Sequence, residues 1–183
     1  MEKKSFTYKM TIIGLMAAVI CVLGPLSIPV GLVPVSFTNL AIFFTIYILG
    51  TKKAIVSILL YILIGLVGTP VFSGFSGGLA KILGPTGGYI IGFVFMTFIS
   101  GIFIDKFINK WYLCVLGMIS GTAVCYAFGT IWLSYQADMT LPAAIGIGVI
   151  PFIPGDIIKI IIAAIMGPMN RKRLIKNKLF LYS

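Results

Sequence analysis

One acid and one base stand inside an otherwise uncharged apolar segment near the C-terminal end of the sequence. Asp156 and Lys159 are three residues apart within the run of residues 143–167. Because residues i and i+3 share a helix face, the carboxylate and the ammonium can neutralise each other and offer a small solute an acceptor beside a donor. Ionisable groups inside membrane segments are costly and usually functional, so we favour a polar clamp on a solute over a structural ion pair.

Other residue types that carry chemistry are scarce. The chain has no histidine and four acidic residues, of which Asp105 and Asp138 are expected at opposite membrane faces. No Gly-Lys dipeptide occurs, which excludes a phosphate-binding loop. Cys21, Cys114 and Cys125 lie singly in apolar runs and are expected as small packing residues. We therefore expect no catalytic residue, no metal site and no enzymatic activity.

The composition indicates that lipid is the main solvent of this chain. Of its 183 residues, 60% are hydrophobic and 10% are charged, and the mean hydropathy is +1.13. Soluble domains carry about 25% charged residues. The net charge of +10 arises from basic residues between apolar runs, a pattern typical of cytoplasmic loops and not of a nucleic-acid groove. We expect one integral membrane domain over residues 1–183, with no nucleic-acid partner.

Breaks in the apolar pattern predict an all-α protein with six membrane helices. The charge-free run of residues 10–51 is too long for one span. The apolar run from Met10 to Val33 is also too long for the hydrophobic region of a signal peptide, so the first helix is expected to be retained. Helix-breaking residues divide this run at Gly24, Pro25, Pro29, Gly31 and Pro34. The expected spans are residues 9–27, 37–50, 54–67, 88–104 and 111–134, and a sixth that follows a short outer helix or turn and starts near Pro154.

Six spans place both termini on one side of the membrane. Most of the basic residues then fall on that side, namely Lys3, Lys4, Lys9, Lys52, Lys53, Lys106, Lys110, Arg171, Lys172, Arg173, Lys176 and Lys178. Only Lys81 lands in an opposite loop. Since Lys and Arg are enriched in cytoplasmic loops, both termini are predicted to be cytoplasmic. The glycine-rich segment 68–88, between the third and fourth expected spans, and the start of the last span then meet at the outer face.

The segment 68–88 is both glycine-rich and apolar. This combination favours a lid that packs closely on a ligand over a plain surface loop, because glycine lets the backbone approach a ligand. Val71, Phe72, Phe75 and Leu79 would cover the apolar part of that ligand. Tyr, Trp and Phe side chains elsewhere are expected mostly to face lipid or the membrane interface.

Small residues also recur four apart on the first expected span. Gly14 and Ala18 form such a pair, with Ala17 beside them. Pairs of this kind allow two helices to approach closely. The sequence leaves open whether this face packs internally or docks a partner protein.

Four segments of the sequence resemble the BioY family, the biotin-specific S components of energy-coupling-factor (ECF) transporters. They are VPVSFTNL (residues 33–40), GTPVFSGFSGG (68–78), LGPTGGY (83–89) and GVIPFIPGDIIK (148–159). Their order and spacing extend the resemblance over nearly the whole chain. Lys81 departs from the pattern, since a neutral residue is expected before the GPTGGY turn.

The resemblance implies the ECF S-component fold and high-affinity capture of biotin from outside a prokaryotic cell. It implies partnership with a transmembrane coupling subunit, which docks on Gly14 and Ala18, and with two cytoplasmic ATPase subunits. ATP is used by the partners only, and no cofactor is expected. The implied substrate-binding residues are Thr38, Asn39, Gly74, Phe75, Ser76, Gly77, Gly78, Tyr89, Asp156 and Lys159.

The alternative function is a self-sufficient secondary transporter of a small vitamin-like solute. Many such transporters contain internal repeats, and none is visible here. A lone acid paired with a lysine is also a poor proton relay.

Overall fold

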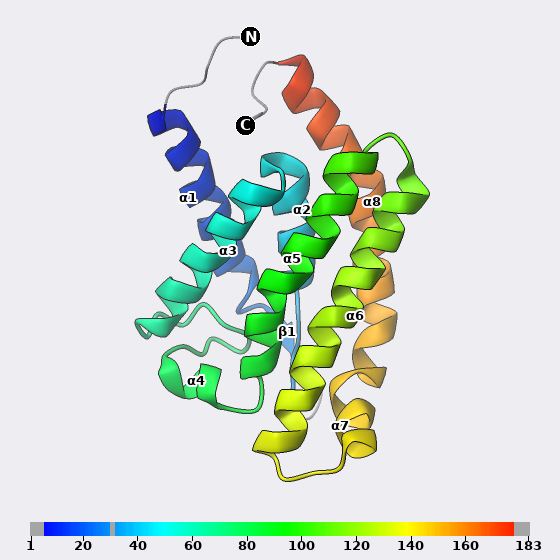
Figure 1. The fold of residues 1–183 in the computed structure, drawn as a ribbon. Helices are drawn as coiled ribbons and strands as arrows, with labels where there is room; N and C mark the ends of the chain where they lie inside the picture. The colour runs from blue at the N-terminus through cyan, green and yellow to red at the C-terminus, as the bar shows by residue number, and fades with distance from the viewer. Residues whose placement is uncertain (1–5, 30–31, 178–183) are drawn as a thin grey trace.

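The computed structural model describes residues 6–29 and 32–177 and is mostly helical (Figure 1). The predictions made for Lys3, Lys4, Gly31 and Lys178 lie outside these residues. The elements in chain order are α1 (Phe6–Leu23), β1 (Ser27–Ile28), β2 (Val35–Ser36), α2 (Thr38–Leu49), α3 (Thr51–Leu66), α4 (Leu79–Leu83), α5 (Gly87–Phe107), α6 (Trp111–Gln136), α7 (Leu141–Gly148), the 3-10 helix η1 (Ile150–Phe152) and α8 (Ile153–Lys176).

Glycine and proline end the first helix earlier than predicted. Helix α1 stops at Leu23 instead of residue 27, because Gly24 and Pro25 follow. A Cβ atom on Gly24 would lie 2.6 Å from the Val71 carbonyl oxygen, so only glycine allows this close approach. Beyond this point β1 and β2 form a short antiparallel hairpin, with Ser27 opposite Ser36, that the sequence did not predict.

Two of the segments that connect the long helices are themselves partly helical. The glycine-rich segment includes the five-residue helix α4. A short helix does precede the last span, as expected: it is α7, which η1 connects to α8.

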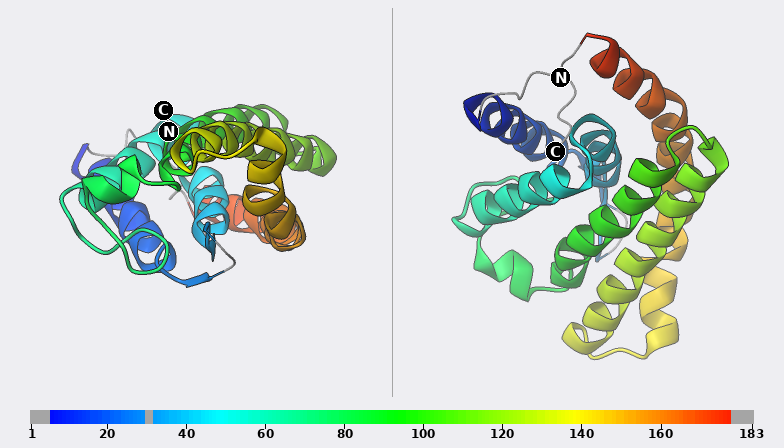
Figure 2. Two further views of the ribbon diagram at one scale, coloured as in Figure 1. Left: turned by 90° about the horizontal axis from the view of Figure 1, so that it is seen from below. Right: turned by 45° about the horizontal axis from the view of Figure 1, so that its top comes forward.

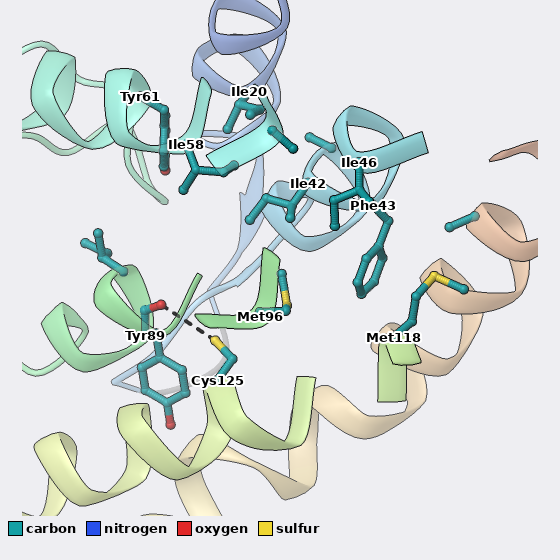
Figure 3. Packing of buried hydrophobic residues seen from close by; sticks show 14 of the residues in the cluster. Ile20, Ile42, Phe43, Ile46, Ile58, Tyr61, Tyr89, Met96, Met118 and Cys125 are labelled. Carbon is teal, nitrogen blue, oxygen red and sulfur yellow. Dashed lines mark hydrogen bonds between the residues drawn. The ribbon is translucent and has the colours of Figure 1, made fainter. Parts of the chain in front are cut away.

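Helix α2 lies at the centre of the molecule, between α1 and α3 on one side and α8 on the other (Figure 2). Eight of its twelve residues are buried, which leaves it little lipid-facing surface. Its Ile42, Phe43 and Ile46 are in the main hydrophobic core with Ile20 of α1 and Met118 of α6 (Figure 3).

Small residues bring α5 and α6 into close contact along their length. A Cβ atom on Gly121 of α6 would lie 2.2 Å from the Ser100 hydroxyl of α5. A Cβ atom on Gly92 of α5 would lie 3.0 Å from the Cys125 sulfur. Glycines at such positions allow helix backbones to approach each other within a membrane.

Within residues 6–29 and 32–177, four segments are long and apolar enough to cross a membrane: α1, α5, α6 and the α7–α8 segment, residues 141–176. The apolar helix α2 has 12 residues and α3 has 16. At about 1.5 Å per residue, α2 is roughly 18 Å long, which is shorter than a hydrocarbon core of about 30 Å. The chain is therefore an integral membrane protein with four apolar helices of spanning length.

A polar cluster around Asp105 joins three helices, α3, α5 and α8, at the end of the bundle opposite α4 and α7. Asp105 of α5 accepts hydrogen bonds from the Thr51 backbone amide (2.8 Å) and hydroxyl (2.5 Å) at the start of α3. Arg171 of α8 donates to the same carboxylate at 2.6 Å. Arg171 was expected only as one of the cytoplasmic basic residues, yet it is 4% exposed. Gly50, with φ of +76°, makes the turn from α2 to α3 beside this carboxylate.

Candidate functional site

A polar cavity opens among the helix ends at the α4–α7 end of the bundle. It is partly open and lies between several helices, a common place for small-molecule sites. Residues from β2, α2, α3, α5, α6, η1, α8 and the connecting loops line it: Val33, Pro34, Ser36, Thr38, Asn39, Tyr61, Phe72, Ser73, Thr86, Tyr89, Ile90, Phe93, Cys125, Tyr126, Phe152, Asp156 and Lys159.

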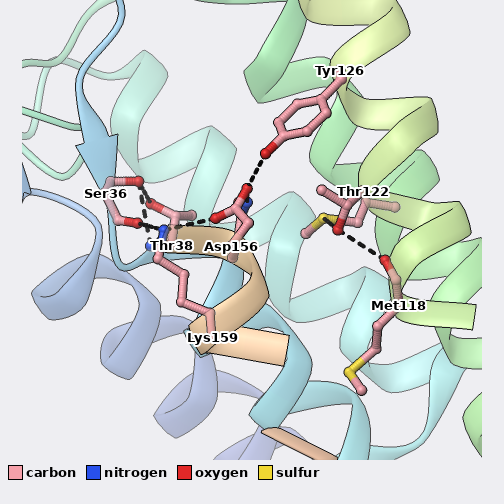
Figure 4. Close-up of polar contacts among 9 residues, drawn as sticks. Ser36, Thr38, Met118, Thr122, Tyr126, Asp156 and Lys159 are labelled. Carbon is pink, nitrogen blue, oxygen red and sulfur yellow. Dashed lines mark hydrogen bonds and ion pairs between the residues drawn. The ribbon is translucent and has the colours of Figure 1, made fainter. Parts of the chain in front are cut away.

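Asp156 is the polar centre of this cavity. It lies in the first turn of α8, is 4% exposed, and accepts hydrogen bonds from three different elements (Figure 4). The Asn39 side-chain amide donates to Oδ2 at 3.0 Å, and the Tyr126 hydroxyl donates to the same oxygen at 2.5 Å. Lys159 Nζ donates to Oδ1 at 2.8 Å. A carboxylate has about four acceptor positions, so one remains for a ligand.

Lys159 completes the ion pair that the i, i+3 spacing predicts. Its ammonium group contacts Asp156 and also donates to the Ser36 carbonyl oxygen at 2.7 Å. An ammonium has three N–H donors, so one is left for a ligand. The pair is neutral as a whole, and it offers one further acceptor and one further donor to the cavity.

The other predicted residues at helix starts also reach the cavity. Thr38 begins α2, and its hydroxyl shares a 2.8 Å hydrogen bond with the Ser36 hydroxyl. Asn39 follows it and holds Asp156. Tyr89, in the first turn of α5, lines the cavity with its ring, while its hydroxyl donates to the Gly148 carbonyl oxygen at 2.8 Å.

The structure does not bring residues 74–78 to the cavity. Gly74 and Gly78 have φ of +74° and +86°, so they serve the turns of the loop itself. A Cβ atom on Gly77 would lie 2.3 Å from the Thr69 carbonyl oxygen, and the Ser76 hydroxyl donates to the Ser73 carbonyl oxygen. Phe75 also has a positive φ, and its side chain is 67% exposed.

The same loop contributes two earlier residues to the cavity, Phe72 and Ser73. Phe72 is buried and packs edge-on against Tyr61 at a centroid distance of 5.5 Å. A Cβ atom on Gly65 would overlap the Phe72 ring, so glycine at this position of α3 makes room for it. The Gly74 amide also donates to the Pro25 carbonyl oxygen, which anchors the loop.

Sequence reasoning missed Tyr126. It was grouped with the aromatic residues expected to face lipid or the interface, and the structure shows instead that its hydroxyl binds Asp156. Tyrosine is enriched near membrane interfaces, whereas Tyr126 lies well inside the 26-residue helix α6. Its position in the middle of a membrane helix, away from both interfaces, was the feature of the sequence that could have identified Tyr126 as a site residue.

The remaining predicted residues lie away from the cavity. Gly14 and Ala18 are exposed on α1, whereas Ala17 is buried, and nothing in the described structure lies within 4 Å of a Cβ atom on Gly14. Lys81 lies in α4 and does not line the cavity. Its partial burial lowers the pKa of its ammonium group.

Comparisons with known proteins agree on one family. The sequence model of the BioY family matches residues 1–176. Biotin transporter BioY2 of Lactococcus lactis subsp. cremoris is 36% identical over 160 residues, covering 87% of this chain and 88% of that protein. Biotin transporter BioY of Thermotoga maritima is 35% identical and covers 87% and 93%. The probable biotin transporter BioY of Pyrococcus horikoshii is 39% identical and also covers 87% and 93%.

A solved structure has the same fold. The crystal structure of the S-component for biotin from an ECF-type ABC transporter superposes with a TM-score of 0.85. It is 32% identical in sequence, and the alignment covers 94% of this chain and 95% of that chain.

Proposed function

The chain belongs to the BioY family, and on that premise we propose that it captures biotin with high affinity as the substrate-binding subunit of an ECF-type ABC importer. The observation that carries the proposal is the Asp156 carboxylate, held by Asn39, Tyr126 and Lys159 in the wall of the cavity. Such a preorganised polar group fixes the orientation of a ligand, and the apolar wall supplies the rest of the affinity.

The chemistry of biotin suits this cavity. Its ureido ring carries two N–H donors and one carbonyl acceptor. The remaining acceptor position of Asp156 takes one N–H, and the third N–H of Lys159 faces a ligand acceptor. Phe72, Tyr89 and Phe93 provide apolar cover for the thiophane ring and the valerate chain. Each hydrogen bond to a charged group contributes about 1.5–3 kcal/mol, and apolar contact adds about 25 cal/mol per Å² of buried surface.

We propose that six helices cross the membrane, α1, α2, α3, α5, α6 and α8, with both termini in the cytoplasm. Lys9, Lys52, Lys106, Lys110 and Arg173 support this orientation, because they belong to the helix ends away from the cavity, and Lys and Arg are enriched at cytoplasmic faces. The cavity then opens toward the outside. The centrally buried α2 is short, which fits a helix shielded from lipid by its neighbours.

The partners that we propose are a transmembrane coupling subunit and two cytoplasmic ATPase subunits. The exposed pair Gly14 and Ala18 on α1 is the proposed docking face, since small residues allow a partner helix to approach closely. The chain needs no cofactor and catalyses no reaction of its own. The proposed location is the cell membrane of a prokaryote, and the relatives named above come from such organisms.

Uptake of labelled biotin tests this proposal. Cells without a biotin importer should accumulate biotin when they produce this chain together with a coupling subunit and ATPase subunits, and variants that cannot hydrolyse ATP should abolish accumulation. A biotin-dependent proton current in liposomes that contain this chain alone would support the secondary-transporter alternative instead.

A further inference from the structure

The glycine-rich segment carries large apolar side chains that point away from the protein. Phe75, Leu79 and Leu83 are each more than half exposed, and Leu79 and Leu83 are i, i+4 neighbours on one face of α4. Phe75 has a left-handed φ of +52°, which is unfavourable for a bulky residue, yet this backbone holds its ring outward. Exposure of such side chains to water costs free energy, and clusters of them mark interaction surfaces.

The exposed side of α3 shows how far lipid extends toward this segment. Val56, Leu59, Leu63 and Val67 are exposed and recur three or four residues apart, so they form one apolar stripe. Val67 directly follows the last residue of α3 and is 88% exposed. The lipid-facing surface of α3 therefore continues to the end of the bundle where the cavity opens.

The glycine-rich segment returns to the depth at which this stripe ends. The Gly78 amide donates to the Gly65 carbonyl oxygen at 2.7 Å, and Gly65 is in the last turn of α3. Leu79 follows Gly78 directly and begins α4. Helix α4 therefore starts beside the end of a lipid-facing helix, where acyl chains give way to headgroups.

Lys81 provides a cation on the other side of α4. At 3.6 residues per turn it points away from Leu79 and Leu83. Its side chain is half-buried, which lowers the pKa of the ammonium group, and neither ion pair among the described residues includes it. An apolar face opposite a basic one is typical of a helix that lies in the membrane interface, with the lysine stem over apolar surface and its ammonium among the headgroups.

We propose that α4 and the turn before it lie in the phospholipid interface, with Phe75, Leu79 and Leu83 among the acyl chains and Lys81 on a lipid phosphate. In the orientation proposed above, this is the outer leaflet. The same loop carries Phe72 and Ser73 of the cavity wall, so its contact with lipid holds that edge of the cavity in place. Phe75 then binds the membrane and not the substrate.

Quenching of tryptophan fluorescence by brominated phospholipids tests this proposal on the full chain in nanodiscs. Phe75→Trp and Leu79→Trp each add an indole at the proposed depth. Thr140→Trp is the matched control, because it adds an indole to the exposed α6–α7 turn, which lies farther along the bundle than α4 (Figure 1). The unaltered protein gives the emission of Trp111 and Trp132, which is subtracted.

The first two variants should lose most of the added emission to lipids brominated near the headgroup end of the acyl chain, and less to lipids brominated near the chain terminus. Aqueous iodide should quench them weakly. Thr140→Trp should show the reverse pattern. Lys81→Glu, combined with Leu79→Trp, should reduce quenching by the lipid, since an acid repels the phosphate, whereas Lys81→Arg should preserve it.

Three results would contradict this assignment. Iodide quenching of the Phe75 and Leu79 variants as strong as that of Thr140→Trp would place the segment in water. Protection from both quenchers would mean that protein, such as a second copy of this chain, covers these side chains. Unchanged lipid quenching in Lys81→Glu would overturn the phosphate contact. The measurement needs no biotin, so its outcome is independent of the proposed function.

Discussion

The Tyr126 hydroxyl of α6 donates a hydrogen bond to the Asp156 carboxylate of α8 across the cavity wall, with 2.5 Å between the two oxygens. Because Asn39 binds the same oxygen from α2, three helices determine the orientation of one carboxylate. Asp156 is thus oriented before a ligand arrives, and little further ordering is needed on binding.

Removal of the Tyr126 hydroxyl tests this arrangement. Tyr126→Phe should weaken biotin binding about tenfold, since Asp156 loses one of the donors that orient it and a hydrogen bond to a charged group contributes about 1.5–3 kcal/mol. Isothermal titration of detergent-purified protein measures the effect. Tyr135→Phe is the matched control on the same helix, because Tyr135 is 82% exposed, and it should bind as the unaltered protein does. Equal affinities for the two variants would remove Tyr126 from the site.

Asp156→Asn should weaken biotin binding at least about tenfold while the protein remains folded. The change removes the negative charge that accepts the ligand N–H and leaves Lys159 buried without its counter-ion. Titration gives the affinity, and size-exclusion chromatography with a melting curve checks the fold. A folded variant with undiminished affinity would show that Asp156 does not bind the ligand.

The α1 surface should matter for assembly and not for ligand binding. Gly14→Trp and Ala18→Trp should retain biotin affinity, because neither residue lines the cavity, but should abolish co-purification with the coupling subunit. Leu63→Trp, at an exposed position of α3, is the control and should assemble normally. Normal co-purification of the Gly14 or Ala18 variant would place the docking face elsewhere on the protein.

The polar cluster of Asp105, Thr51 and Arg171 should contribute to the stability of the protein and not to ligand binding. Asp105→Asn removes the negative charge that pairs with the buried Arg171 guanidinium at 2.6 Å and that also accepts the Thr51 amide. Breaking a fully buried pair costs about 3–5 kcal/mol, and the partial exposure of Asp105 reduces this figure. Differential scanning calorimetry should show a lower melting temperature, with biotin affinity preserved. Asp138→Asn, in the turn between α6 and α7, should melt at the same temperature as the unaltered protein. A similar loss of stability in both variants would contradict a specific role for Asp105.

The local features of this fold were predictable because they depend on neighbours in the sequence. Apolar runs and their Gly and Pro interruptions put the last three long helices close to their observed starts at Gly87, Trp111 and Ile153. The contact between Asp156 and Lys159 follows from helical periodicity alone.

Contacts between distant segments were not predictable from one sequence. Tyr126 binds Asp156 because α6 packs against α8, and Arg171 of α8 reaches Asp105 near the end of α5. No local pattern in the sequence encodes these contacts. In the glycine-rich loop, the sequence alone could not show which of two identical side chains lines the cavity. Its backbone turns decide that Phe72 enters the cavity while Phe75, with a positive φ, faces outward, although the two have the same side chain.

Isothermal titration of the purified protein with biotin, alongside thiamine and riboflavin, tests the central claim most directly. We predict tight binding of biotin near one per chain, and no heat of binding with the other two vitamins. Protein that is folded and free of co-purified ligand, yet gives no heat with biotin, would contradict the proposed substrate while leaving the membrane fold in place.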